Sequence, residues 1–342
     1  MIPLTPKEVF IRTARRVFGE KRVHDYLIKR GIKLRHLNEG YESVSSSENV
    51  VDADANSTNR QTLIFMADGK WMHGGLTDRL RGMTSAYKFA KDHGLDFKIY
   101  HISPFLLQEI LQPNKVDWII DEKEISHNCS IAKPLLLYRE DFDNDSALER
   151  QIDANHQQFH LYSCVDTLGD KFSEYFNELF KPSPLLESDI SRYENLLGKS
   201  YTSISFRFQN KLGDFKEYIF KELPEKSKHK LMNEAINVLK EETSHHLVNE
   251  ISKTLVTADS PTFLAEAAKI PNVAIVKGNS IHIDFNCSKK AVDYLKAFTE
   301  FFLISKATKA KLYRNRKYKT YPSNFPKYAA LLGQVPYEII EK

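Results

Sequence analysis

The chain has 342 residues and an ordinary globular composition, with 42% hydrophobic and 27% charged residues, a mean hydropathy of -0.44 and a net charge of +4. A charge this small does not indicate a nucleic-acid-binding protein. No run approaches the roughly 20 apolar residues that cross a bilayer, and the N-terminus lacks the apolar segment of a signal peptide, so we expect a cytoplasmic protein. The length favours two domains, each with its own core.

The three cysteines, Cys129, Cys164 and Cys287, show no CxxC spacing. This argues against a zinc site or a disulfide framework and predicts buried thiols.

The first 40 residues form a basic arm, with ten lysines and arginines against four acidic residues. The apolar residues between them have a spacing compatible with an amphipathic helix. Two interpretations stay open: a helix packed on the protein with a solvated basic face, or a helix that contacts a membrane surface. Residues 42–60 are rich in Ser, Asn and Asp and are typical of a linker. We therefore assign residues 1–60 to a helical arm and linker.

From Gln61 onward, strand and helix patterns alternate, which favours a mainly parallel sheet covered by helices. We assign residues 61–198 to a first Rossmann-like domain. Its expected elements are strands 62–66, 97–102, 117–120, 135–138 and 158–163 and helices 76–92, 104–111 and 170–180.

The turn before helix 76–92 contains Gly74 and Gly75, followed by Asp78, Arg79 and Arg81. Strand, glycine turn and helix are how α/β proteins build phosphate sites, because glycine allows a tight turn and the helix N-terminus offers N–H groups and partial positive charge. The two arginines add positive charge. A plain structural turn explains the same residues, so both interpretations stay open.

A second series of elements begins after Pro182, Ser183 and Pro184 and a bridging helix at 187–197. We assign residues 199–342 to a second Rossmann-like domain, which predicts an α/β fold with two such domains facing each other across a nucleotide-binding cleft. The expected elements are strands 201–208, 253–257 and 273–276 and helices 227–247, 261–269, 289–307 and 323–332.

Ligands of such folds bind outside the carboxyl ends of the strands, so the loops that follow strands are the first place to look for a site. Arg207 lies near the end of strand 201–208, and Asp214 follows seven residues later. An arginine in an apolar strand needs an anionic partner, because burying it unpaired is costly. That partner is either a diphosphate or a carboxylate of the core.

Three more polar residues precede helices in this half. Asp259 or Ser260 is suited to cap helix 261–269, and Ser323 either caps the last helix or holds phosphate oxygens together with the adjacent N–H groups. A second basic cluster, Lys306 to Lys319, has seven basic residues and no acidic one. We expect it to line the cleft of an anionic ligand.

Four segments, in this order, resemble the fucosyltransferases that use GDP-fucose, a family that includes α1,6-, α1,2- and protein O-fucosyltransferases and the rhizobial chitooligosaccharide enzyme. They are Ser205-Phe206-Arg207 at the family's His-x-Arg, residues 255–267 at its Thr-Asp-Asp-Pro stretch, Glu300 to Ala307, and Ser323 to Ala330. The resemblance covers residues 61–340. Ser205 replaces the usual His, Phe208 stands where some members have a second Arg, and one residue is inserted near Asp259.

The resemblance implies a GT-B fold, with the donor held mainly by the second domain and the acceptor on the side of the first. Arg207 would pair with the β-phosphate and stabilise the leaving diphosphate. Glu300 would accept the guanine N1–H and N2–H groups; the alternative is a solvated Glu300 paired with Lys296. Asp214 is the expected base and Asp78 its rival. The implied donor-binding residues are Gly74, Gly75, Arg79, Ser205, Asp259, Glu300, Ser323 and Asn324.

The implied activity is an inverting, metal-independent transfer of fucose from GDP-fucose to a hydroxyl of a glycan acceptor. The acidic runs 52–54 and 141–145 superficially resemble metal-binding DxD motifs, but we interpret them as solvated loops. The basic arm fits an enzyme that acts on bacterial polysaccharide or glycolipid precursors, with peripheral contact to the inner membrane surface. Two alternatives stay open: an enzyme of the same fold that uses another nucleotide sugar, and a non-catalytic nucleotide- or glycan-binding homologue.

Overall fold

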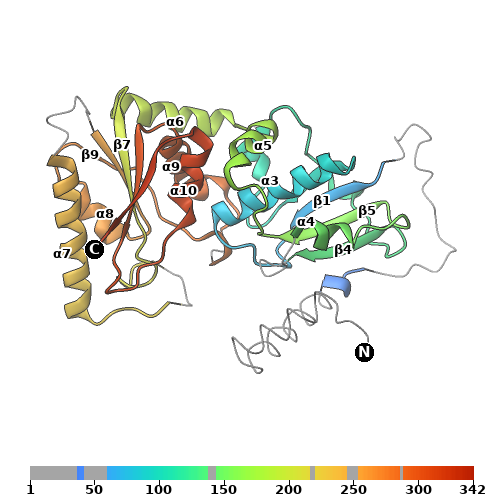
Figure 1. Ribbon diagram of the computed structural model, residues 1–342, viewed down its shortest axis with the longest axis horizontal. Helices are drawn as coiled ribbons and strands as arrows, with labels where there is room; N and C mark the ends of the chain where they lie inside the picture. Colours follow the sequence, from blue (N-terminus) through green and yellow to red (C-terminus); the bar gives the residue numbers. More distant parts are fainter. Residues whose placement is uncertain (1–36, 42–59, 138–143, 216–219, 245–252, 286–287) are drawn as a thin grey trace, which may run out of the picture.

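The computed structural model describes residues 37–41, 60–137, 144–215, 220–244, 253–285 and 288–342. They form two parallel β-sheets that lie side by side, each flanked by helices (Figure 1). The predicted α/β class is therefore confirmed. Most of the basic arm and linker lies outside the described residues, and the domain boundary after residue 198 stays a prediction. None of the helices in these ranges is long and apolar enough to cross a lipid bilayer.

The first sheet has four parallel strands in the order β2-β1-β5-β4. Leu63 to Ala67 of β1 are all fully buried, as expected for a central parallel strand covered on both faces. Helix α3 begins and ends at the predicted residues. The bounds are β1 (Thr62–Ala67), β2 (Asp96–His101), β4 (Ala132–Leu137) and β5 (Gln158–Ser163), with α3 (Leu76–Asp92), α4 (Asn144–Glu149) and α5 (Phe172–Leu179).

The second sheet has five parallel strands in the order β11-β10-β7-β8-β9. Two of them were not predicted. Strand β10 lies inside the basic cluster, where Ala310 and Leu312 are fully buried and alternate with Lys309 and Lys311, so the period of two was hidden by the charge. The bounds are β7 (Tyr201–Phe206), β8 (Lys253–Ala258), β9 (Val273–Ala274), β10 (Lys309–Arg314) and β11 (Tyr337–Glu341).

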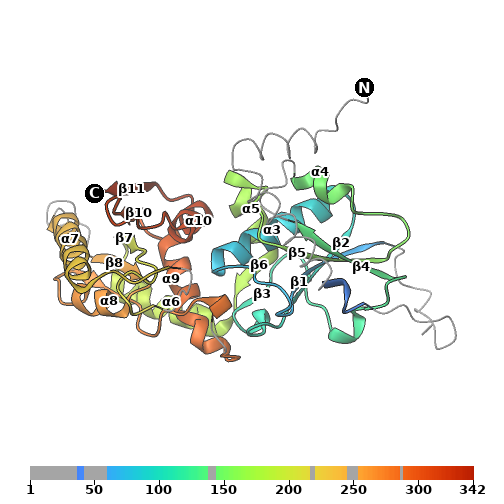
Figure 2. The same ribbon diagram turned by 90° about the horizontal axis from the view of Figure 1, so that it is seen from below.

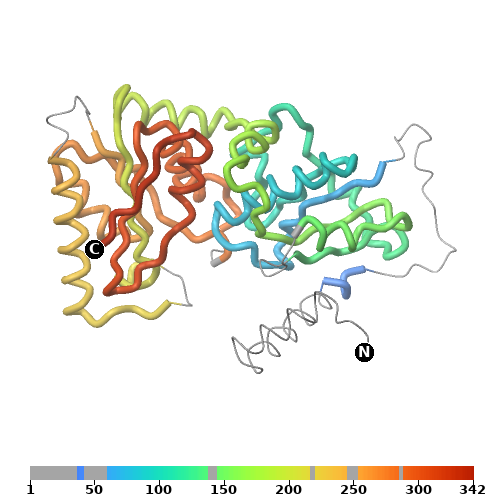
Figure 3. The backbone as a smooth tube through the Cα atoms, viewed as in Figure 1, coloured from blue at the N-terminus to red at the C-terminus, as the bar shows by residue number. Residues whose placement is uncertain are grey.

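Helices α9 and α10 lie between the two sheets (Figures 1 and 2). They pack on α5 through aromatic rings: Phe172 meets Tyr328 edge-on at 5.0 Å between centroids, and Phe176 meets Phe302 at 6.0 Å. Figure 3 shows the backbone passing from the first sheet to the second through α6. The remaining bounds are α6 (Pro184–Leu197), α7 (Glu225–Ser244), α8 (Pro261–Ala267), α9 (Leu295–Ser305) and α10 (Asn324–Gly333).

Three predicted elements differ from the structure. Residues 117–120 form only a bridge between Ile119 and Ile99, and the helix predicted at 104–111 shortens to a 3-10 turn because Leu111–Pro113 (β3) pairs with Phe180–Pro182 (β6). The helix predicted at 289–307 begins as a 3-10 turn, with α9 proper starting at Leu295. Side-chain hydrogen bonds from Ser288 to Asp293 and from Tyr294 to the Ser288 carbonyl compete there with α-helical pairing.

Candidate functional site

A cavity of about 540 Å³ is lined by residues that follow β1, β7, β8 and β10, and so by both halves of the molecule. Its size suits a nucleotide-sized ligand. Asp214 and Arg79, both predicted for the site, do not line this cavity. The other predicted site residues line it: Gly74, Gly75, Asp78, Ser205, Arg207, Asp259, Glu300, Ser323 and Asn324.

Arg207 is held on the cavity wall by Asp259. Its Nη1 donates to Asp259 Oδ2 at 2.8 Å, and its guanidinium lies 5.0 Å from the centre of the Phe215 ring. The backbone N–H groups of Phe208 and Gln209 donate to the same carboxylate at 2.9 and 2.6 Å. Burial raises the pKa of Asp259, against the opposing effect of the Arg207 charge. The core carboxylate expected as one alternative is thus present, and it orients Arg207 rather than removing it from the cavity.

Asp214 belongs to the support of α8. Its Oδ2 accepts from the Ser260 hydroxyl at 2.6 Å and from the Thr262 N–H at 2.9 Å, while Ser260 Oγ caps the helix by accepting from the Phe263 N–H at 3.1 Å. Asp214 therefore does not line the cavity, and its assignment as the base stays a prediction. Its carboxylate anchors a helix N-terminus outside the cavity, and Ser260 is the residue that caps this helix.

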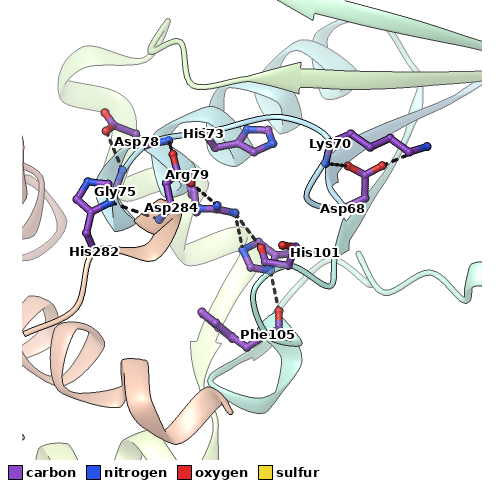
Figure 4. Close-up of polar contacts among 12 residues, drawn as sticks. Asp68, Lys70, His73, Gly75, Asp78, Arg79, His101, Phe105, His282 and Asp284 are labelled. Carbon is purple, nitrogen blue, oxygen red and sulfur yellow. Dashed lines mark hydrogen bonds and ion pairs between the residues drawn. The ribbon is translucent and has the colours of Figure 1, made fainter. Parts of the chain in front are cut away.

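The glycine turn at 74–75 is built around two carboxylates. Gly74 has a φ of +88°, and a side chain there would collide with Asp78. The Gly74 N–H donates to Asp284 Oδ2 at 2.5 Å. The Gly75 N–H donates to Asp78 Oδ2 at 3.1 Å (Figure 4). These two amides therefore bind the protein's own carboxylates, as in the plain-turn interpretation, although both glycines line the cavity.

Arg79 is buried beside the cavity and joins the two halves of the molecule. Its Nη2 donates to Asp284 Oδ1 at 2.7 Å, with the two side chains 5% and 4% exposed. Its Nη1 lies 3.3 Å from His101 Nε2, whose other nitrogen, Nδ1, donates to the Phe105 carbonyl at 3.0 Å (Figure 4). This guanidinium serves an internal ion pair and does not line the cavity, and donor binding by Arg79 stays a prediction.

Glu300 and Lys296 line the cavity as a buried ion pair one turn apart on α9. Their side chains are 8% and 4% exposed and are joined by a hydrogen bond. Burial raises the pKa of the Glu300 carboxyl, while the Lys296 charge opposes the rise. The predicted alternative was right about the partner and wrong about the environment, since neither side chain is solvated.

Three serine and asparagine positions take ordinary structural roles while lining the cavity. Ser205 Oγ is 2.8 Å from Thr257 Oγ1 and buried, so it ties β7 to β8 where the family's histidine would stand. Ser323 caps α10 by accepting from the Phe325 N–H at 3.2 Å, and Asn324 is the first residue of that helix. The N-cap interpretation of Ser323 therefore holds, and its place on the cavity wall also allows the phosphate contact.

Sequence reasoning missed His282 and Asp284, which lie in the loop after β9. His282 Nδ1 accepts from the Asp284 N–H at 3.3 Å, and burial, with the charges of Arg207 and Arg79, lowers the pKa of His282 to about 4. Both residues alternate with apolar Ile281 and Ile283. Polar side chains in such a stretch need buried partners, and that was the signal available in the sequence.

The basic cluster 306–319 does not line the cavity, so this expectation is corrected. Six of its seven basic residues pair with glutamates of α6, α7 and β11. The pairs are Lys306 with Glu194, Lys309 with Glu338, Lys311 with Glu242 and Glu338, Arg314 and Arg316 with Glu341, and Lys317 with Glu234.

The predictions for the two acidic runs and for the cysteines fall only partly on the described residues. Asp145, in α4, pairs with Lys88 at 3.0 Å, and the other aspartates of the two acidic runs lie outside the described residues. Cys129 is exposed and Cys164 half-buried, so the prediction of buried thiols is wrong for Cys129, and Cys287 lies outside the described residues.

The fold is similar to that of known fucosyltransferases. The crystal structure of NodZ α-1,6-fucosyltransferase soaked with GDP-fucose matches 82% of this chain and 94% of its own, with 14% identity and a TM-score of 0.52. Fucosyltransferase NodZ from Bradyrhizobium matches 83% of this chain and 96% of its own, with 15% identity and a TM-score of 0.52. No protein-family model matches the sequence, and no curated protein matches it significantly. The chain therefore has the GT-B fold of NodZ, and identity this low shows the fold alone.

Proposed function

We propose that the protein is an inverting glycosyltransferase that transfers fucose from GDP-fucose to a hydroxyl group of a glycan acceptor. The observation that carries the proposal is Arg207: an oriented guanidinium, 20% exposed, on the wall of a nucleotide-sized cavity lined by both halves of the molecule. The fold supports the choice of donor, since NodZ, whose crystal was soaked with GDP-fucose, has a similar fold. The two-domain arrangement belongs to the same proposal.

In this reaction an acceptor oxygen attacks the anomeric carbon of fucose, and the bond to the diphosphate breaks. Negative charge develops on the departing GDP, and a fixed guanidinium stabilises it without reorganising, because Asp259 and Phe215 already hold it in place. Arg207 therefore has a catalytic role in the proposal, with Ser323 and the first N–H groups of α10 beside the phosphates.

The acceptor hydroxyl loses its proton to a base on the cavity wall. With Asp214 outside the cavity, we assign this role to Asp78, which lines the cavity and accepts the Gly75 N–H. Asp78 also pairs with Arg81. Asp78→Asn, which keeps the size of the side chain, should lower turnover and leave GDP affinity nearly unchanged.

The proposed reaction needs no metal ion, because Arg207 supplies the positive charge that a divalent cation supplies elsewhere. Turnover in excess EDTA should equal turnover in Mg²⁺ or Mn²⁺. Loss of activity with chelator, restored by one metal, would direct attention back to the acidic run 141–145.

A nucleotide panel tests the proposal against its two alternatives. A ligand that binds only the folded state stabilises it by about 2.7 kcal/mol at a hundred times its dissociation constant, which a thermal-shift assay detects readily. Stabilisation by GDP and not by UDP or CMP supports the proposal. A preference for UDP or CMP points to another nucleotide sugar. No stabilisation by any nucleotide, together with no turnover of GDP-fucose, points to a non-catalytic homologue.

The acceptor and the site of action complete the proposal. We place the enzyme in the cytoplasm, acting on a bacterial surface polysaccharide or glycolipid precursor, with the basic residues of 1–40 in contact with the anionic inner membrane surface. Co-sedimentation with anionic vesicles and not with neutral ones is the expected result, and equal sedimentation with both would remove the membrane contact.

A further inference from the structure

The ion pair between Lys296 and Glu300 lies on the cavity wall, and the stability of the fold does not explain it. Both side chains are more than nine-tenths buried, and both line the cavity. A buried ion pair contributes little to stability, since apolar residues of similar size commonly do as well or better. A function at the cavity surface explains why two charges lie there.

The two side chains of the pair are hydrogen-bonded to each other. Lys296 and Glu300 are four residues apart on α9, so they lie on the same face of the helix. Gly278, at a φ of +123°, lies over the stem of Lys296: a side chain there would begin 3.6 Å from the Lys296 Cβ and Cδ atoms. The Lys296 ammonium group donates to the Glu300 carboxylate, so this part of the cavity wall carries donor N–H groups beside two carboxylate oxygens.

This order of donor and acceptors complements the edge of a guanine base. Guanine presents an oxygen at position 6, an N–H at position 1 and an amino group at position 2. We infer that Lys296 is a specificity-determining residue, which donates to the 6-oxo oxygen while Glu300 accepts from N1–H and the 2-amino group. The inference rests on the proposed function and adds to it the residue that reads the oxygen.

Other bases do not match this order of donor and acceptors. Uracil presents oxygens on both sides of its N–H, so its second oxygen would face a Glu300 oxygen. Adenine presents an amino group where Lys296 also donates. A mismatch that leaves a buried charge unpaired typically lowers affinity by about tenfold or more.

Calorimetric titration with GDP, inosine diphosphate and ADP measures the affinities that distinguish the role of Lys296 from that of Glu300. Inosine diphosphate keeps the 6-oxo oxygen and lacks the 2-amino group. Lys296→Met should weaken GDP and inosine diphosphate by the same factor, about tenfold, without weakening ADP. Glu300→Gln should lower the ratio of GDP affinity to inosine diphosphate affinity and improve binding of xanthosine diphosphate, whose 2-oxo oxygen can accept from the new amide. Lys306→Met, at the end of the same helix in an exposed pair with Glu194, is the matched control and should change none of these affinities.

The double variant Lys296→Met/Glu300→Gln guards against a simple loss of folding, because it leaves no unpaired charge. It should fold and bind GDP and ADP with nearly equal affinity. If the parent prefers GDP and Lys296→Met weakens every nucleotide equally, or none, the inference is overturned and the proposed function stands. If the parent binds no GDP, the proposed function fails first.

Discussion

The Arg207 side chain pairs with Asp259 and also lies on the cavity wall, where we propose that it contacts the ligand. Its partner Asp259 also accepts two backbone N–H groups, so the carboxylate stays hydrogen-bonded when the arginine is removed. This arrangement makes Arg207 testable without unfolding the protein.

Arg207→Ala should lower turnover of GDP-fucose about 100-fold or more, because it removes a charge-assisted contact worth about 2–4 kcal/mol in the transition state. Arg207→Lys should restore only part of the activity, since an ammonium group cannot donate bidentately. Steady-state kinetics and a melting curve are the measurements. Arg192→Ala is the control: Arg192 is 65% exposed and pairs with Asp189 on α6. A folded Arg207→Ala variant with full activity would reduce Arg207 to a structural residue.

Asp284 holds two groups of the other half of the molecule, the Gly74 N–H and the Arg79 guanidinium. Asp284→Asn leaves Arg79 buried without a counter-charge and should lower the free energy of unfolding by about 3–5 kcal/mol. Urea denaturation measures the change. Asp92→Asn breaks an exposed pair with Lys88 and should cost less than about 1 kcal/mol. Equal effects of the two substitutions would show that leaving Arg79 without its counter-charge costs no more than breaking a surface pair.

The site residues that sequence predicted best are those that follow strands or begin helices. Arg207, Asp259 and Ser323 each follow a parallel strand, and the carboxyl ends of parallel strands lie at the same edge of the sheet. Their position in the sequence is therefore enough to predict that they lie near one another. The pairing of Arg79 with Asp284 joins residues 205 positions apart, and no local pattern encodes it. The place of Asp214 outside the cavity was missed for the same reason, since the adjacent helix cap that binds it follows only from the fold.

At the scale of elements, most helices and strands were predictable because their apolar residues recur with a clear period. Helix α3 shows this best, since its predicted and observed ends agree. Strand β10 was missed because its lysines and arginine mask the alternation of buried residues, and β11 was missed because it is short and has no buried residue. β11 is the edge strand of its sheet, and a short edge strand limits association with other sheets.

Gly82 gives a test of how closely α3 packs on the first sheet. In an exposed helix, Gly→Ala stabilises by about 1 kcal/mol through backbone entropy. Here a new Cβ atom would lie 2.7 Å from the Ser163 carbonyl oxygen, which belongs to β5. Gly82→Ala should therefore destabilise the protein despite the better helix propensity. A higher melting temperature for Gly82→Ala would contradict the close approach of helix and strand.

At the scale of the whole molecule, buried neutral histidines make stability depend on pH. Burial lowers the pKa of His73 to about 4 and those of His101 and His160 to about 3. The unfolded chain binds protons near the ordinary value of 6.5 and the folded protein does not, so the free energy of unfolding should fall as pH drops from 6.5 toward 4. The slope is about 1.4 kcal/mol per pH unit for each histidine that titrates only on unfolding.

Urea denaturation at several pH values between 7.5 and 4.5 measures this slope. A stability that stays constant or rises as the pH falls over this interval would contradict a pH dependence set by these buried histidines. Replacing His101 with Gln should reduce the slope, because it removes one of the groups that bind a proton on unfolding.

The central claim is that a guanosine diphosphate binds in the cavity between the sheets with its phosphates against Arg207. A crystal structure of the GDP complex tests it most directly. The expected result is a phosphate oxygen within about 3 Å of the Arg207 guanidinium, at hydrogen-bond distance, and a base that faces Glu300 and Lys296. A nucleotide bound elsewhere on the protein, or bound in the cavity with its phosphates away from Arg207, would contradict the account.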